Sequence, residues 1–160
     1  MVKFGAPKGN GGGQDPAAAA FHVAKEFAEI MVPHGDLDPT IIVLSPDGKL
    51  TMAHLTGDKE GYYQATLDAL RQFNAQWYVY LMEAWTTQRK LSDPGPRGRI
   101  SDLPLDDRKE EVMVYLIQKG RGLALAERAD VIRYKDQRRL GPWQMDTSEM
   151  VFSKLTPLDW

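Results

Sequence analysis

The stretch that decides the fold is Trp77-Tyr-Val-Tyr-Leu-Met-Glu-Ala-Trp-Thr-Thr87, in which nearly every side chain is apolar or aromatic. Successive side chains of a strand point to opposite faces, so Val79 and Leu81 share one face while Tyr78 and Tyr80 share the other. A strand that is apolar on both faces belongs in the interior of a sheet that is covered on both sides. The stretch therefore predicts a central strand.

A second run of this kind, Val112–Ile117, follows a long polar segment. We expect it to be the antiparallel neighbour of the first run, because both are apolar on both faces and they follow one another in sequence. A less regular strand is predicted over Leu123–Tyr134. We expect the polar segment Lys135–Arg139 to break the chain, and a last, edge strand over Met150–Leu155.

The N-terminal half predicts two helices around a hairpin. Asp15-Pro16 is typical of a helix start, since Asp caps and Pro suits the first helical position, and Pro33 ends that helix. Ser45-Pro-Asp-Gly-Lys49 predicts a tight turn between two β-rich runs. A second helix is expected from Asp58 to Gln72. The fold class is then α+β: an antiparallel sheet of about five or six strands with two helices packed on it, in the order helix, hairpin, helix, strands.

The domain organisation is simple. Residues 1–14 are rich in glycine and predict a flexible N-terminal tail, residues 15–160 predict a single domain, and a long loop is expected at 88–110. The chain contains no cysteine, which excludes disulfides and thiolate chemistry and fits a cytoplasmic protein. No apolar run reaches the ~18 residues of a membrane-spanning helix.

The net charge of −2 conceals a gradient along the chain. Residues 1–70 hold 5 basic and 9 acidic side chains, whereas residues 71–160 hold 15 basic and 13 acidic ones. The segment Lys119–Arg139 is the most basic, with 7 basic and 3 acidic residues. This excess is smaller than that of a typical nucleic-acid-binding domain.

The sequence contains no phosphate-binding glycine loop, nucleophile elbow or paired-histidine motif, so we expect neither a cofactor nor a metal. Glu83 is the one residue that invites a chemical interpretation, because a carboxylate on an apolar strand face must be paired. One interpretation is an ion pair with Arg99, Arg108 or Arg128. The alternative is a metal-dependent hydrolase or nuclease. Its carboxylates would be Glu83, Asp102, Asp106, Asp107 and Glu110.

A binding role is the main expectation for the rest of the surface. A loop of the length of 88–110 is usually functional or disordered, and we expect residues 91–104 to be mobile until a partner orders them. Residues 88–108 of this loop, together with the segment 119–139, predict contact with a protein partner or with copies of the chain. A weak nucleic-acid-binding module, with Trp85 or Tyr134 for stacking, is a further alternative. The candidate binding residues are Trp85, Arg97, Arg99, Arg108, Arg121, Arg133, Arg138 and Arg139.

One segment carries a family resemblance. Glu83-Ala-Trp85, a loop rich in proline and glycine, and then Pro104, Asp107-Arg108 and Glu111 lead into Val112-Met-Val. Over residues 78–117 this pattern resembles small uncharacterised α+β proteins of bacterial and phage genomes. The resemblance implies a compact single domain without a cofactor, encoded by a phage or another mobile element.

Overall fold

The computed structural model describes residues 2–4, 15–86, 109–146 and 156–160. The predicted loop at 88–110, apart from its last two residues, and the predicted strand Met150–Leu155 therefore lie outside the described residues. The elements are β1 Val2–Phe4, α1 Pro16–Met31, the 3₁₀ helix η1 Val32–His34, β2 Thr40–Leu44, β3 Leu50–His54, α2 Lys59–Gln72, β4 Trp77–Thr86, β5 Lys109–Gln118, β6 Gly122–Tyr134, β7 Gln137–Leu140 and β8 Gln144–Met145.

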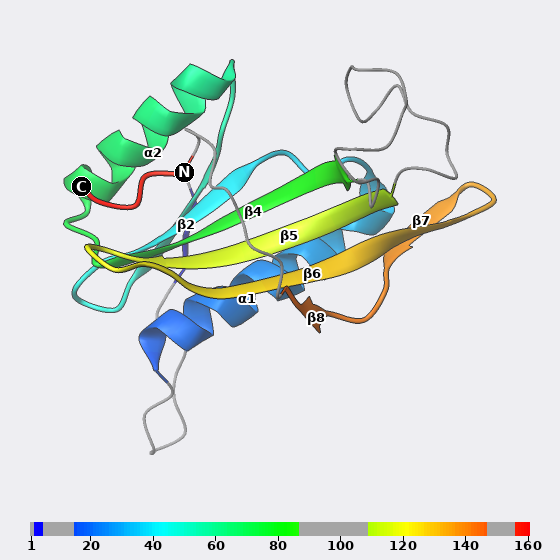
Figure 1. Ribbon diagram of the computed structural model, residues 1–160, viewed down its shortest axis with the longest axis horizontal. Helices are drawn as coiled ribbons and strands as arrows, with labels where there is room; N and C mark the ends of the chain where they lie inside the picture. Colours follow the sequence, from blue (N-terminus) through cyan, green and yellow to red (C-terminus); the bar gives the residue numbers. More distant parts are fainter. Residues whose placement is uncertain (1, 5–14, 87–108, 147–155) are drawn as a thin grey trace, which may run out of the picture.

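These elements form an antiparallel sheet with the order β1-β3-β2-β4-β5-β6-β7, and β8 also pairs with β6. The α+β class is confirmed, and β4 and β5 are neighbours in the middle of the sheet as predicted. The element order differs from the predicted one because a short strand, β1, precedes α1 and pairs with β3. Figure 1 shows α1 lying along one face of the twisted sheet and α2 on the other side.

Local sequence explains the helix starts and the hairpin. The Asp15 side chain accepts a hydrogen bond from the backbone of Ala17, and Asp58 accepts one from Gly61, so each aspartate caps its helix. Gly48 has a φ of 85° in the turn between β2 and β3, a conformation that glycine adopts without strain.

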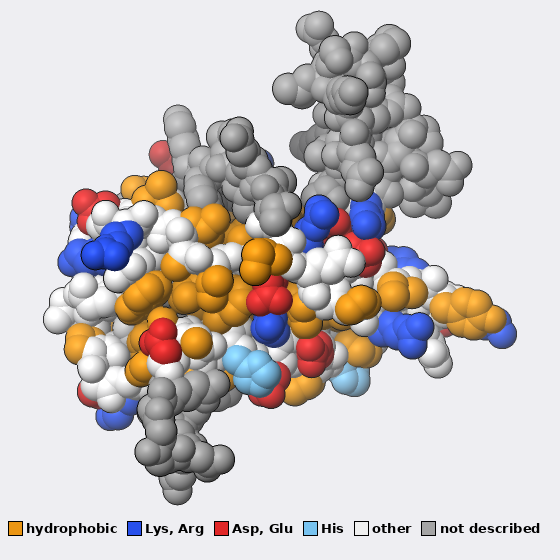
Figure 2. Space-filling view, turned by 60° about the horizontal axis from the view of Figure 1, so that its bottom comes forward, with side chains coloured by type: hydrophobic (Ala, Val, Ile, Leu, Met, Phe, Trp, Pro, Cys, Tyr) orange, Lys and Arg blue, Asp and Glu red, His pale blue; other side chains and the backbone are white. Residues whose placement is uncertain are grey.

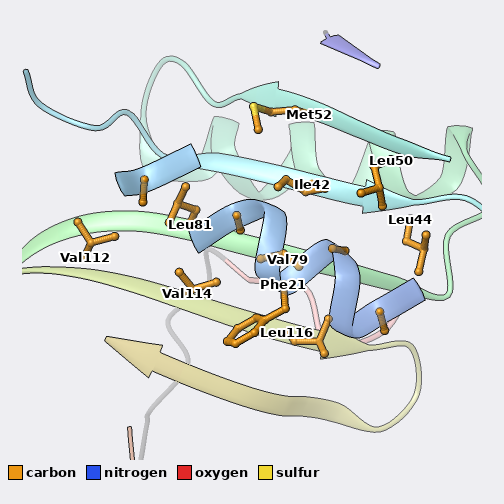
Figure 3. Packing of buried hydrophobic residues seen from close by; sticks show 14 of the residues in the cluster. Phe21, Ile42, Leu44, Leu50, Met52, Val79, Leu81, Val112, Val114 and Leu116 are labelled. Carbon is orange, nitrogen blue, oxygen red and sulfur yellow. The ribbon is translucent and has the colours of Figure 1, made fainter. Parts of the chain in front are cut away.

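The two faces of β4 belong to two separate cores. Val79 and Leu81 are fully buried under α1 together with Val112, Val114 and Leu116 of β5, as Figure 3 shows. Tyr78 and Tyr80 face the other way, into the core under α2. Burying one such aliphatic side chain stabilises the fold by about 1.5–3 kcal/mol, so these two layers fix the register of the central strands.

The segment Lys135–Arg139 is where the sequence-based description is wrong. It does not break the chain: residues 135 and 136 make a two-residue turn, and β7 pairs back onto β6. Figure 1 shows this β6–β7 hairpin extending beyond the neighbouring strands at one end of the sheet. This polar strand is accommodated because Arg138, on one of its faces, is held by ion pairs, as the next section describes.

Candidate functional site

Charged side chains from separate parts of the chain meet on the α1 side of the sheet, where β4 ends and β5 begins. Glu83 lies there because it is two positions along the strand from Leu81 and so shares its face. Glu110 of β5 pairs with Trp85 and lies diagonally across from Glu83. Arg133 and Arg138 are cross-strand partners in the β6–β7 hairpin, so both point toward the same face.

Arg138 is the centre of this group. Its Nη2 donates to Oε1 of Glu83 at 2.5 Å, and its Nη1 donates to Oδ1 of Asp36 at 2.7 Å. The same Nη1 lies 3.7 Å from Oε1 of Glu110. The side chains of Arg138, Glu83 and Glu110 are only 9%, 8% and 8% exposed, so one buried guanidinium bridges two buried carboxylates and one exposed carboxylate.

Two further groups complete the network, which we call the Arg138 cluster: Asp36, Glu83, Glu110, Arg133 and Arg138. Arg133 binds Glu110 through two hydrogen bonds, Nε to Oε2 at 2.7 Å and Nη2 to Oε1 at 2.9 Å. The backbone N–H of Leu37 donates to Oε2 of Glu83 at 2.7 Å. Bidentate and charge-assisted hydrogen bonds are the strong ones, so the cluster ties the β6–β7 hairpin, one residue pair from its turn, to β4, β5 and the turn after η1.

The two buried carboxyls differ in their affinity for a proton. Burial, and then the neighbouring Glu110 carboxyl, raise the pKa of Glu83, although Leu37 and Arg138 act against this shift. Burial is also the largest influence on Glu110 and acts in the same direction, but the hydrogen bonds with Arg133 and Glu83 and the charges of Arg133 and Arg138 together hold the pKa of Glu110 below its usual value. Glu83 is therefore the carboxyl that takes up a proton first on acidification.

The chemistry open to this arrangement is limited by Arg138. Asp36, Glu83 and Glu110 each offer an oxygen, and the three oxygens lie within 4.8 Å of one another, a spacing that suits a divalent cation. A shallow pocket of about 230 Å³ adjoins them and is also lined by Trp85. The Arg138 guanidinium, however, already contacts all three carboxylates. A metal ion would have to displace this built-in cation.

The predicted acidic group is thus brought together only in part. Glu83 and Glu110 meet as predicted, while Asp102, Asp106 and Asp107 lie outside the described residues. The prediction that an arginine neutralises Glu83 is confirmed, but the partner is Arg138. The candidate Arg128 lies on the other face of the sheet, 3.6 Å from Glu111, and the candidates Arg99 and Arg108 are outside the described residues.

The candidate binding residues do not form one continuous surface. Arg138 is buried in the cluster and Arg133 is paired with Glu110, whereas Arg139 is exposed. Arg121 is exposed at the opposite end of β6, a strand of 13 residues and so about 40 Å long. Trp85 lines the pocket, and Arg97, Arg99 and Arg108 lie outside the described residues.

Sequence reasoning missed Asp36 as a partner of Arg138, and it missed the exposed Ile132, which lies on the same face of the hairpin as the stacking candidate Tyr134. Ile132 is 38% exposed and Tyr134 is 70% exposed. Figure 2 shows hydrophobic and basic side chains together at the end of the molecule where the hairpin lies. The available signal was Tyr134-Lys-Asp-Gln137, a polar turn that directly follows an aromatic residue at the end of a predicted strand.

Comparisons of the chain with protein-family models, with curated proteins and with solved structures give no match. Within the described part of the chain, no helix has the length and apolar character needed to cross a membrane.

Proposed function

We propose that the protein is not an enzyme and acts by binding another protein chain, either a different protein or a second copy, through the β6–β7 hairpin. The observation that carries the proposal is the contrast between the two faces of the hairpin. Arg133 and Arg138 on one face are held by carboxylates, while Ile132 and Tyr134 on the other face are exposed. The lack of cysteine supports a cytoplasmic setting, and phage or mobile-element origin stays a prediction.

The anchoring of the hairpin by Arg133 and Arg138 matters because binding loses affinity when flexible segments must be ordered. A hairpin fixed by the Arg138 cluster presents its tip in one orientation before a partner arrives. Tyrosine and arginine are also the side chains that most often dominate binding energy at protein interfaces. Tyr134 and Arg139 supply one of each on the exposed face of the hairpin.

Nucleic-acid binding is supported less well. Of the four basic residues on the hairpin, Arg133 and Arg138 are already paired, which leaves Lys135 and Arg139 for phosphates. With two phosphate contacts, the logarithm of the binding constant falls with the logarithm of the salt concentration with a slope of only about −1.8. Proteins whose affinity depends on the phosphate backbone make roughly 6–10 such contacts and show a much steeper slope. We therefore expect only weak, non-specific binding.

Site-specific photo-crosslinking tests the proposal. A benzophenone amino acid replaces Tyr134 in the protein expressed in its source cells, and a matched control carries it at Ile30, which is 63% exposed on α1. We expect a discrete crosslinked protein from position 134 and none from position 30. Equal crosslinking at both positions, or none at position 134, would refute a role for the hairpin.

A second candidate function is divalent-cation binding by Asp36, Glu83 and Glu110, favoured by the convergence of their oxygens. Under the first proposal the Arg138 guanidinium stays between these three carboxylates, and we expect Mn²⁺ to leave the melting temperature unchanged. A saturable rise in melting temperature with Mn²⁺ that is absent in Glu83→Gln would support the second candidate instead.

A further inference from the structure

The face of the β6–β7 hairpin that points away from the Arg138 cluster has a defined composition. Cross-strand partners share a face, so Ile132 lies beside Arg139 and Tyr134 lies beside Gln137. All four side chains are exposed. We call these four residues, with Lys135 of the turn, the outer hairpin face.

The outer hairpin face carries positive charge that no described carboxylate neutralises. Neither Lys135 nor Arg139 forms an ion pair with a described residue. The Lys135 ammonium lies 5.5 Å from the ring centroid of Tyr134, so the charge sits directly beside the aromatic surface. Asp136, in the turn, is the one acidic side chain within the hairpin itself, and Asp130, farther along β6, is held 3.1 Å from Lys109.

We infer that the outer hairpin face binds an acidic, extended segment of a different protein, in which carboxylates flank a large apolar side chain. The inference rests on the proposed function and names its partner chemistry. Arg139 is suited to a carboxylate, because a guanidinium can donate two parallel hydrogen bonds to it. Ile132 and Tyr134 supply the apolar contact. The partner segment is extended because a two-stranded ribbon, with strands about 4.8 Å apart, offers a narrow strip.

The probe is a library of random peptides displayed on filamentous phage and selected on the immobilised full-length protein. We expect the enriched peptides to share Asp or Glu beside an aromatic or large aliphatic residue. One enriched peptide, made with a fluorescent label, is then titrated by anisotropy. Its affinity should fall at least tenfold in Tyr134→Ala and about tenfold in Arg139→Glu, which corresponds to ~1.4 kcal/mol. The matched control Arg71→Glu, an exposed arginine of α2, should leave the affinity unchanged.

The outcomes separate the inference from the proposed function. Neutral or basic peptides that still require Tyr134 would refute the acidic partner but leave the hairpin as a binding site. Peptides whose binding ignores Tyr134 and Arg139, or no enrichment at all, would refute both. Because the substituted side chains are exposed, circular dichroism and melting temperature should stay unchanged in each variant.

Two other occupants of the outer hairpin face would also overturn the inference. Tight binding of fluorescent oligo(dT) at physiological salt, lost in Arg139→Glu, would assign the face to nucleic acid. Self-association in light scattering, lost in the same variant, would assign it to a second copy of the chain.

Discussion

Replacing Arg138 by methionine removes the cation that bridges the carboxylates of β4, β5 and the turn after η1. Glu83 then keeps the hydrogen bond from the Leu37 backbone but loses its cationic partner among the described residues, while Glu110 keeps Arg133. Removing one partner of a buried ion pair costs about 3–5 kcal/mol, because it leaves a buried charge uncompensated. Asp36 is 87% exposed and adds little. We expect a loss of about 3 kcal/mol near pH 7, a large part of a typical stability of about 5–15 kcal/mol.

Urea unfolding at several pH values tests both the size and the origin of this loss. Burial already raises the pKa of Glu83, and removal of Arg138 raises it further. A group whose folded-state pKa lies above its unfolded value, about 4.3 for glutamate, contributes stability that is complete below the unfolded pKa and lost as pH rises through the folded pKa. The difference between Arg138→Met and the parent protein should therefore shrink as pH falls from about 7 toward 4.3.

A second substitution separates lost charge pairing from lost packing. The double variant combines Glu83→Gln with Arg138→Met. The amide oxygen of the introduced glutamine can still accept the hydrogen bond from the Leu37 N–H, but the side chain carries no buried charge. This double variant should regain most of the lost free energy of unfolding near neutral pH. A loss below about 1 kcal/mol in Arg138→Met, a loss independent of pH, or no recovery in the double variant would each contradict the role given to Arg138.

Three further predictions concern the fold. Asp58→Ala, which removes the cap that accepts from Gly61 at 2.8 Å, should lower the free energy of unfolding by about 1 kcal/mol in a urea titration; no change would mean that the cap is dispensable. Leu81→Ala should cost about 2–5 kcal/mol in the same assay, because the side chain is fully buried under α1. Burial raises the pKa of Tyr80 to about 12, so phenolate absorbance should show it titrating well above an ordinary tyrosine, and stability should fall between about pH 10 and pH 12. Titration of all tyrosines near pH 10 in the folded protein would disprove this burial.

The central strands could be predicted because their information is local. The runs 77–82 of β4 and 112–117 of β5 are apolar on both faces, and this pattern is satisfied only in a sheet covered on both sides. The helix starts at Asp15 and Asp58 were also predictable, since a cap involves residues only a few positions apart. Strand β7 was not, because three of the four residues in Gln137–Leu140 are polar and the segment has no apolar alternation.

The same distinction, between information carried by neighbouring residues and contacts between distant ones, explains how much of the candidate site could be predicted. Glu83 stands out in the sequence because a carboxylate on a buried strand face has to find a cation, and this much needs only the alternation of side chains. Which cation it finds depends on the hairpin that brings Arg138 back across β6, 55 positions away from Glu83 in the chain. The polar sequence of β7 and the ion pair that orders it are two sides of the same feature: the residue that makes the segment polar also anchors it. Arg138 helps make β7 look like a loop in the sequence, yet its pairing with a buried carboxylate is what allows so polar a segment to pack against the end of the sheet as a strand. A buried acid on a central strand therefore predicts more than an isolated ion pair: it predicts that some polar, arginine-bearing segment elsewhere in the chain is ordered beside it.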